Sequence, residues 1–332
     1  MSAPRAAPRG FLARAASALL ILMTLVCFVI SAMTLSYFGV KYDEAGGSAL
    51  HKLHPASWIA CLALMATFAA RRDRIDWIAG LPARFPGAAL FTGSWITIIL
   101  FAQIVQHTPL MPLVDTFFCA LVFLVLWEDA DCETRNFITV MLHVVLVGNA
   151  LIGIGEFVTH KRLTPFVTGG REVLYDYRST ALLGHPLLNA GTTGGYMLMM
   201  IFGGDRAVSL LPRLAIIGVC GVALVAFGGR TAIVMSIALT ALGSIMPILR
   251  TLAGARFDLR GALAFSLVVP LAVGVLAFAY ASGSLDQLIE RFTDDKGSAE
   301  ARVLMLQLFS HFTWEELFFG PDPVRLEGYM RL

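Results

Sequence analysis

The sequence predicts an all-α fold, a polytopic integral membrane helix bundle of about nine transmembrane helices with a helical tail outside the membrane. Hydrophobic residues make up 57% of the 332 positions and charged residues only 14%, whereas about a quarter of the residues in a soluble domain are charged. Long apolar runs also recur along the chain, and a helix of about 20 apolar residues spans a hydrocarbon core. We expect a transmembrane domain over residues 1–281 and an outer segment over residues 282–332.

Nine apolar runs are candidate spans. The first run follows a basic N-terminal stretch but has no clear small-residue cleavage site, so we interpret it as a retained helix. The sixth run is the least apolar, because it carries Asn189, Thr192 and Thr193. In chain order the runs are Ala15–Val40, Pro55–Ala70, Pro86–Val105, Leu110–Trp127, Asn136–Thr159, Pro186–Gly203, Leu211–Gly228, Thr231–Leu249 and Gly261–Ala281.

The placement of arginine predicts the orientation, because lysine and arginine concentrate in short cytoplasmic loops. Three arginines precede the first run and four lie between the second and third runs, namely Arg5, Arg9, Arg14, Arg71, Arg72, Arg74 and Arg84. We therefore expect the amino terminus in the cytoplasm and the tail on the outer side. Further basic residues lie in the long outer segments after the fifth and ninth runs, where they suggest an anionic ligand.

The sequence carries no signature of a metal, redox or nucleotide site. Five cysteines, at positions 27, 61, 119, 132 and 220, form no CxxC pair, metal spacing or disulfide framework. Gly153 and Gly155 lie inside a span, where glycines serve helix packing rather than phosphate binding. We expect no cofactor, no metal and no nucleic-acid partner. In the tail, Leu285–Phe292 and Ser298–Phe309 are expected to form amphipathic helices.

Glu156 and Arg178 are the first two candidate site residues, and the outer segment after the fifth run separates them. A carboxylate near the end of a span needs a partner or water. Glu156 therefore either orients an arginine or a hydroxyl at the site or faces water beside His160. Arg178 carries a planar fork of donors that suits phosphate oxygens. It either clamps a diphosphate at the membrane surface or is an interfacial arginine whose stem covers apolar surface.

His185, Arg230 and Arg302 complete the candidate set. His185 precedes the proline that opens the sixth run, where an imidazole serves either as a base or donor near neutral pH or as a helix cap. Arg230 follows two glycines in a turn with no room for a loop, so it is held at the outer edge of the eighth run either as a ligand or as an anchor. Arg302, in the second helix of the tail, is by itself a solvated charge.

Four short motifs follow one another from the fifth run to the tail. They are Gly153-Ile154-Gly155-Glu156-Phe157, Arg178-Ser179-Thr180-Ala181-Leu182-Leu183-Gly184-His185-Pro186-Leu187, Phe227-Gly228-Gly229-Arg230-Thr231-Ala232, and Ala301-Arg302 with Leu317-Phe318-Phe319-Gly320-Pro321-Asp322. Their order resembles the O-antigen ligase and polymerase superfamily, the Wzy/WaaL-like membrane glycosyltransferases, and within it the exopolysaccharide polymerases. The similarity covers roughly Gly153 to the end, and the earlier helices match only in general character.

The resemblance implies a GT-C-like, multi-pass enzyme of the bacterial inner membrane. Such an enzyme transfers or polymerises a polyprenyl-diphosphate-linked oligosaccharide onto a sugar acceptor at the periplasmic face, without a nucleotide sugar or a required metal. Its partners would be the lipid bilayer and the flippase and export proteins of polysaccharide assembly. By the resemblance Arg178 and Arg302 bind the diphosphate and Arg230 is the arginine at a span edge. Preplaced guanidinium groups stabilise the charge of a diphosphate leaving group. We take His185 and Glu156 as catalytic candidates.

The chain departs from the family pattern after the Gly320-Pro321-Asp322 turn. The family's outer loop continues to a histidine and to further membrane helices, whereas Leu332 is the last residue here. We expect a truncated copy, inactive on that account, unless His185 takes part of the histidine's role. Two other functions stay open. One is a lipid-linked glycan flippase or transporter, for which an inverted repeat and mid-membrane charges are expected, and the other is a non-catalytic partner in exopolysaccharide export.

Overall fold

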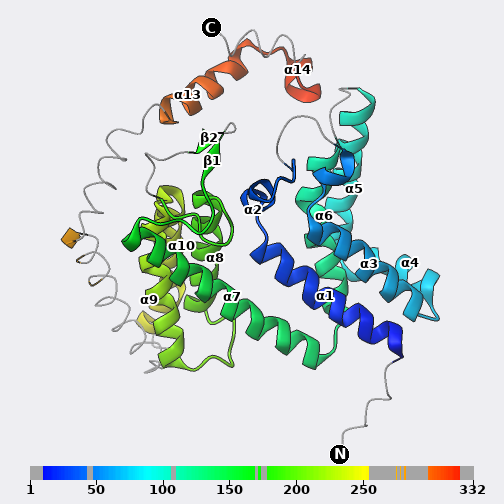
Figure 1. Cartoon of the computed structure of the whole chain (residues 1–332), viewed down its shortest axis with the longest axis horizontal. Coiled ribbons are helices and arrows are strands. Elements are labelled where there is room, and N and C mark those ends of the chain that lie inside the picture. The colour runs from blue at the N-terminus through cyan, green and yellow to red at the C-terminus, as the bar shows by residue number, and fades with distance from the viewer. Residues whose placement is uncertain are drawn as a thin grey trace, which may run out of the picture. The chain divides into compact units, whose positions relative to one another are not determined.

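The computed structural model describes residues 10–42, 48–105, 110–168, 171–172, 178–253, 274, 277, 280–281 and 298–321. The chain divides into two compact units, Met1–Val269 and Pro270–Leu332, and each is described by itself. The first unit holds the helices α1 to α10 and a short hairpin, and the second holds α13 and α14 (Figure 1).

Most helices of the first unit coincide with the predicted apolar runs. The bounds are α1 Phe11–Val29, α2 Ala32–Tyr37, α3 Pro55–Ala70, α4 Arg74–Arg84, α5 Pro86–Ile104, α6 Met111–Asp129, α7 Cys132–Thr159, α8 Pro186–Ile201, α9 Leu210–Phe227 and α10 Arg230–Leu252. A 3-10 turn, η1, covers Ala49–Lys52, and the strands β1 (Val167–Thr168) and β2 (Arg171–Glu172) pair antiparallel. Apart from this hairpin, the all-α prediction is confirmed for the described residues.

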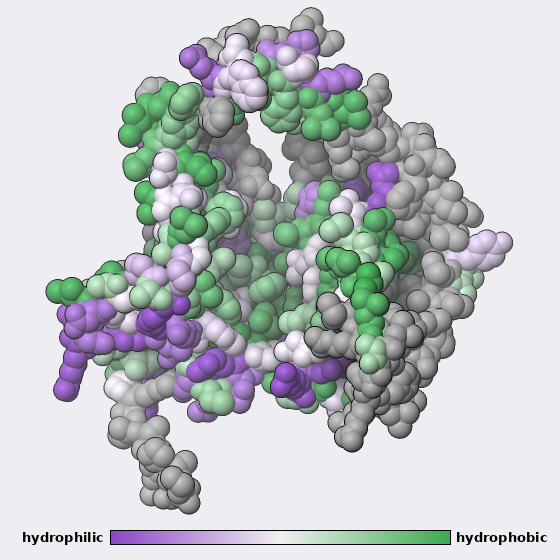
Figure 2. All heavy atoms as spheres, turned by 180° about the vertical axis from the view of Figure 1, so that it is seen from behind, coloured by the Kyte–Doolittle hydropathy of each residue, from purple (hydrophilic) through white to green (hydrophobic). Residues whose placement is uncertain are grey.

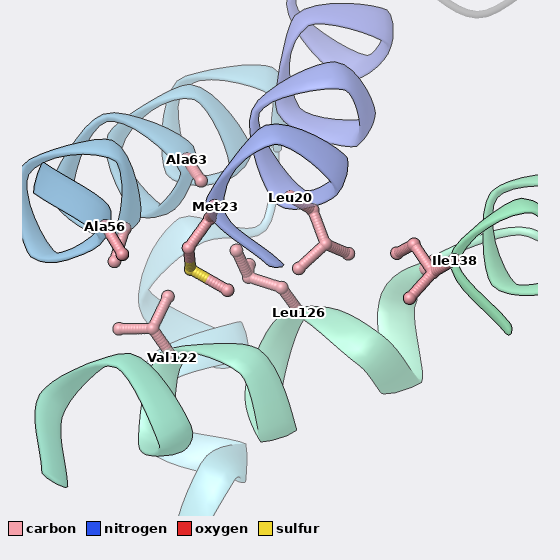
Figure 3. Close-up of a cluster of buried hydrophobic side chains, with 9 residues drawn as sticks. Leu20, Met23, Ala56, Ala63, Val122, Leu126 and Ile138 are labelled. Carbon is pink, nitrogen blue, oxygen red and sulfur yellow. The ribbon is translucent and has the colours of Figure 1, made fainter. Parts of the chain in front are cut away.

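The first core lies between α1, α3 and α6. Figure 3 shows Leu20 and Met23 of α1 pointing toward Val122 and Leu126 of α6. Helix α3 contributes alanines to the same core, and small residues let helix backbones approach closely. Ile138 of α7 adds the last large side chain. The buried members of this cluster are Leu20, Met23, Ala56, Ala60, Ala63, Val122, Leu126, Ala130 and Ile138.

A second core joins α7 to α8 and α9. Its buried residues are Ala150, Ala181, Ala190, Ala223, Leu224 and Phe227. Gly153 of α7 leaves room for the ring of Phe227, because a Cβ at Gly153 would lie 2.4 Å from that ring. Helix α7 has 28 residues and contributes to both cores, Ile138 to the first and Ala150 to the second. It is therefore the element that connects the two groups of helices.

The surface of the first unit is that of a membrane protein. Four helices, α1, α5, α7 and α9, are long and apolar enough to cross a membrane, and α3 and residues 230–245 of α10 are shorter apolar helices. Large apolar side chains point outward from them: Leu90 is 76% exposed and Leu211 is 79% exposed. Apolar residues cover much of the face seen in Figure 2. Apolar surface on this scale requires a covering such as lipid, so the chain is a helical membrane protein.

The first predicted run, Ala15–Val40, was expected to form one helix, but the structure divides it into two. Helix α1 ends at Val29, and the side chain of Ser31 accepts a hydrogen bond from the backbone N–H of Thr34, which starts α2. A serine at this position is a strong helix-start signal, and it outweighs the apolar pattern. The ninth run, Gly261–Ala281, lies outside the described residues except for four positions, as do Leu285–Phe292 and residues 322–332.

Helix α4 was not predicted, because its arginines marked the region as a loop. Asp129 at the end of α6 binds Arg84 and Trp77 of α4 and also Arg71, which ends α3. Arg71 and Arg84 lie 2.8 and 3.0 Å from the Asp129 carboxylate, and Trp77 Nε1 donates to it at 2.9 Å. The Arg71 guanidinium also lies 4.8 Å from the Trp77 ring centre. Part of the basic cluster that predicted a cytoplasmic loop therefore forms a packed network at one end of the helices.

The second unit is described at residues 274, 277 and 280–281 and continuously from Ser298 to Pro321. It contains α13 (Ser298–Leu308), the 3-10 turn η2 (Phe309–His311) and α14 (Trp314–Phe319). Thr313 and Glu316 form a reciprocal capping box at the start of α14, a standard helix-start arrangement. The expected helix Ser298–Phe309 is present as α13.

Candidate functional site

Residues 178–185, here called the 178–185 segment, form a buried irregular stretch directly before α8. Ser179, Thr180 and Ala181 are at most 1% exposed. The Ser179 N–H donates to the carbonyl of Ala226 in α9 at 3.2 Å, and the Ser179 hydroxyl donates to the carbonyl of Gly153 in α7 at 2.6 Å. Buried backbone polar groups need partners, and the neighbouring helices supply them here.

Glu156 of α7 points its carboxylate into this segment. Its Oε2 accepts hydrogen bonds from the N–H groups of Thr180 and Ala181, at 2.8 and 2.9 Å, and its Oε1 accepts one from the N–H of Leu163, at 2.6 Å. The residue is 7% exposed. Glu156 therefore does not face water, which was one of its two sequence interpretations. Its partners are backbone amides rather than an arginine or a hydroxyl.

Two buried asparagines hold the segment from either side. Asn149 of α7 accepts a hydrogen bond from the N–H of Leu182 at 3.0 Å. The amide of Asn189 in α8 donates to the carbonyls of Thr180 and His185 at 2.5 and 3.1 Å. These backbone partners fix the orientation of both side-chain amides. Asn149 Nδ2 and Asn189 Oδ1 are left as buried atoms with no hydrogen-bond partner in the described part of the chain. The contact of Asn149 therefore runs from helix α7 to the segment rather than from one helix to another.

Basic and aromatic side chains meet at the surface of the segment. Arg162 Nε donates to the carbonyl of Arg178 at 3.2 Å. The Arg162 guanidinium lies 5.8 Å from the ring centre of Phe166, and that ring meets the His185 imidazole edge to face at 5.4 Å. Arg162, Arg178 and His185 therefore share one region. Arg162 lies in the outer segment after the fifth predicted run, but it was not among the predicted site residues, because nothing in the linear order pairs it with Arg178.

His185 is the N-cap of α8. Its Nδ1 accepts a hydrogen bond from the N–H of Leu187 at 3.2 Å, so the capping interpretation is correct. A neutral imidazole whose Nδ1 accepts carries its proton on Nε2. In this tautomer Nδ1 is occupied by the cap and the ring proton of His185 lies on Nε2.

Arg230 opens α10 after a two-residue turn. Gly228 ends α9 with a φ of 62°, a conformation that glycine adopts readily. A Cβ on Gly229 would lie 2.2 Å from the Cβ of Ala190 in α8. The turn is therefore packed directly against the beginning of α8, next to the 178–185 segment, and Arg230 begins at this contact.

Four of the five predicted site residues lie on elements that meet at one end of the helices. Glu156 is near the end of α7, Arg178 and His185 bound the 178–185 segment, and Arg230 begins α10. The fifth, Arg302, has its backbone in α13 of the second unit, and its side chain lies outside the described part. Within the described ranges, no group of three or more His, Cys, Asp and Glu residues could hold a metal ion.

A second polar cluster joins α7, α8 and the turn between α8 and α9. His143 Nδ1 is 2.6 Å from the Tyr196 hydroxyl, and its Nε2 is 2.9 Å from the Asp205 carboxylate. The N–H of Ala207 also donates to Asp205 at 2.8 Å, and Arg213 donates to the Val208 carbonyl in the same turn at 3.1 Å. The hydrogen bond from His143, followed by that from Ala207, lowers the pKa of Asp205 below its ordinary value.

We predict that Asp205 contributes to stability only in its ionised form. A carboxyl group whose pKa is lowered in the folded state adds stability above its ordinary pKa near 4, and this stability is lost as the pH falls through the folded value. Asp205→Asn should therefore lower the free energy of unfolding at pH 7 by about 1 kcal/mol, the usual contribution of a hydrogen bond. The unfolding temperature should fall accordingly, and the deficit should shrink below about pH 4. Thermal unfolding in detergent at pH 3 to 8 measures this, with exposed Glu172→Gln as the control. A deficit independent of pH would contradict the prediction.

Comparison with protein-family models, with curated proteins and with solved structures finds no match to this chain.

Proposed function

We propose that this protein is a membrane glycosyltransferase of polysaccharide assembly. It transfers or polymerises a polyprenyl-diphosphate-linked glycan onto a sugar acceptor at the periplasmic face of the bacterial inner membrane, in a GT-C-like bundle of about nine spans. The order of the four motifs supports this assignment, as does the membrane character of the described helices.

The observation that carries the proposal is that basic residues from separate stretches of the chain meet at one end of the membrane helices. Arg162 donates to the backbone carbonyl of Arg178, the His185 ring meets the Phe166 ring beside Arg162, and Arg230 begins at the turn packed on α8. These residues come from separate stretches of sequence, and packing and backbone hydrogen bonds bring those stretches together. A site of this charge at the end of apolar helices suits a ligand with an anionic head and a lipid tail.

The chemistry follows from the charges. In glycosyl transfer from a lipid diphosphate, the acceptor hydroxyl forms the new glycosidic bond, the anomeric carbon–oxygen bond breaks, and the lipid diphosphate leaves with the bonding electron pair. The acceptor proton passes to solvent or to the diphosphate. Negative charge grows on the leaving oxygen, and preplaced guanidinium groups stabilise it in a water-poor site. Arg178 and Arg230 serve this role in the proposal, and the Nε2–H of His185 donates to a diphosphate or sugar oxygen.

Binding and turnover in one preparation test the function. The purified full chain in lipid nanodiscs is mixed with a fluorescent polyprenyl-diphosphate oligosaccharide, with and without an acceptor glycan. Binding together with a longer glycan product supports the proposal. Binding without product, in the presence of the assembly partners, would indicate a non-catalytic partner. Movement of the intact lipid between leaflets of liposomes, without product, would indicate a flippase. Absence of binding would reject a lipid-diphosphate ligand altogether.

A further inference from the structure

We propose that Glu156 is a positioning residue: its carboxylate fills an anion site built by backbone amides, fixes the 178–185 segment, and thereby orients Arg178 and His185. This inference rests on the proposed function for the nature of the ligand. The role of Glu156 in fixing the segment follows from its own hydrogen bonds, whatever the ligand is.

The amides around Glu156 form a concave site for an anion. Thr180 and Ala181 are consecutive, and both N–H groups point to Oε2, at 2.8 and 2.9 Å. Ala181 has a φ of 39°, in the left-handed region that few non-glycine residues adopt. Successive N–H groups next to a left-handed residue form a nest, a backbone arrangement that binds anions elsewhere in proteins. Here a carboxylate of the same chain occupies it.

The negative charge of Glu156 is needed for this arrangement. Both carboxylate oxygens act as acceptors, since Leu163 donates to the second one at 2.6 Å. A glutamine would bring an NH₂ group toward at least one backbone N–H, so that two donors would face each other. Hydrogen bonds to an ionised acceptor are also roughly twice as strong as neutral ones. A carboxylate occupied by three N–H donors serves structure rather than proton transfer.

The effect of Glu156 reaches the basic side chains through a short length of chain. Thr180 is two residues after Arg178, and Ala181 is four residues before His185. The left-handed conformation of Ala181 is unfavourable by itself, so the segment needs an interaction that holds it there. Loss of the carboxylate would let the backbone relax, and the backbone position from which the Arg178 side chain extends would no longer be fixed.

Hydrogen exchange and arginine reactivity test the inference without any ligand. In nanodiscs, Glu156→Gln should speed amide exchange across the 178–185 segment at least tenfold. Phenylglyoxal should then modify Arg178 at a rate approaching that of the exposed Arg206, as followed by mass spectrometry. Glu133→Gln makes the same chemical change in the exposed first turn of α7 and should change neither rate. Glu156→Asp keeps the charge on a shorter stem and should give intermediate rates, which keeps the test valid if the glutamine variant does not fold.

The outcomes separate this inference from the proposed function. Unchanged exchange in both Glu156 variants overturns the inference, and so does faster exchange with unchanged Arg178 reactivity. When the wild type binds a polyprenyl diphosphate, Glu156→Gln should weaken that binding at least tenfold, and unweakened binding would also count against the inference. When the wild type binds none, the proposed function fails, and the exchange and reactivity results still decide the role of Glu156.

Discussion

Replacing Gly229 with alanine is expected to destabilise the protein by about 1–3 kcal/mol, the usual cost of adding a methyl group to a packed core. The new Cβ would lie 2.2 Å from the Cβ of Ala190. Neither atom can move by side-chain rotation, because a Cβ is fixed to its backbone. The turn before α10 and the start of α8 would therefore have to separate, and Arg230 would move away from the 178–185 segment. Chemical unfolding in detergent micelles measures the loss.

Gly191 provides the matched control for this substitution. It is next to Ala190 in α8, and a Cβ added there would meet nothing within 4 Å. Gly191→Ala should leave stability unchanged or raise it by about 0.5–1 kcal/mol, because alanine favours the helix. Equal unfolding midpoints for the two variants would show that the contact between the turn and α8 does not limit stability.

The positions of most apolar helices in the described part of the chain could be predicted from sequence, because length and hydropathy largely decide which segments lipid can cover. α3 was predicted with the bounds that it has in the structure, Pro55–Ala70. The break at Ser31 and the helix α4 were missed, because local capping and the Asp129 network decide them. Both depend on single side chains that a hydropathy pattern averages away.

The candidate site could be predicted only in part. Arg178, His185 and Arg230 stood out because polar residues at the ends of apolar runs need a reason. The partners of Glu156 could not be predicted, since the three groups that donate to its carboxylate are backbone N–H groups, which every non-proline residue carries. Gly153 and Gly155 also looked alike in sequence, yet only Gly153 lies against Phe227. Such distinctions depend on which face of a helix meets which neighbour.

Arg178→Lys is expected to lower the rate of glycan transfer by the active enzyme by about a hundredfold or more. Arg178 is half-buried beside Arg162 and close to the start of α8. A guanidinium grips two phosphate oxygens with parallel N–H donors, whereas an ammonium group is a point charge with no fixed fork. Loss of a bidentate charge-assisted contact removes a few kcal/mol of transition-state stabilisation, at about 1.4 kcal/mol per tenfold in rate. The measurement is glycan product formed per folded protein in nanodiscs.

Arg206→Lys is the control for this substitution, because Arg206 is an exposed arginine in the turn between α8 and α9. It should keep near-normal transfer. The unfolding midpoint of Arg178→Lys should also stay close to that of the wild type, since lysine keeps the positive charge and the backbone carbonyl that accepts from Arg162. A loss of transfer with an intact fold then means that the bidentate contact to the diphosphate is lost. Near-normal transfer by Arg178→Lys would instead make Arg178 an interfacial anchor, and the charge for a diphosphate would have to come from Arg162 and Arg230.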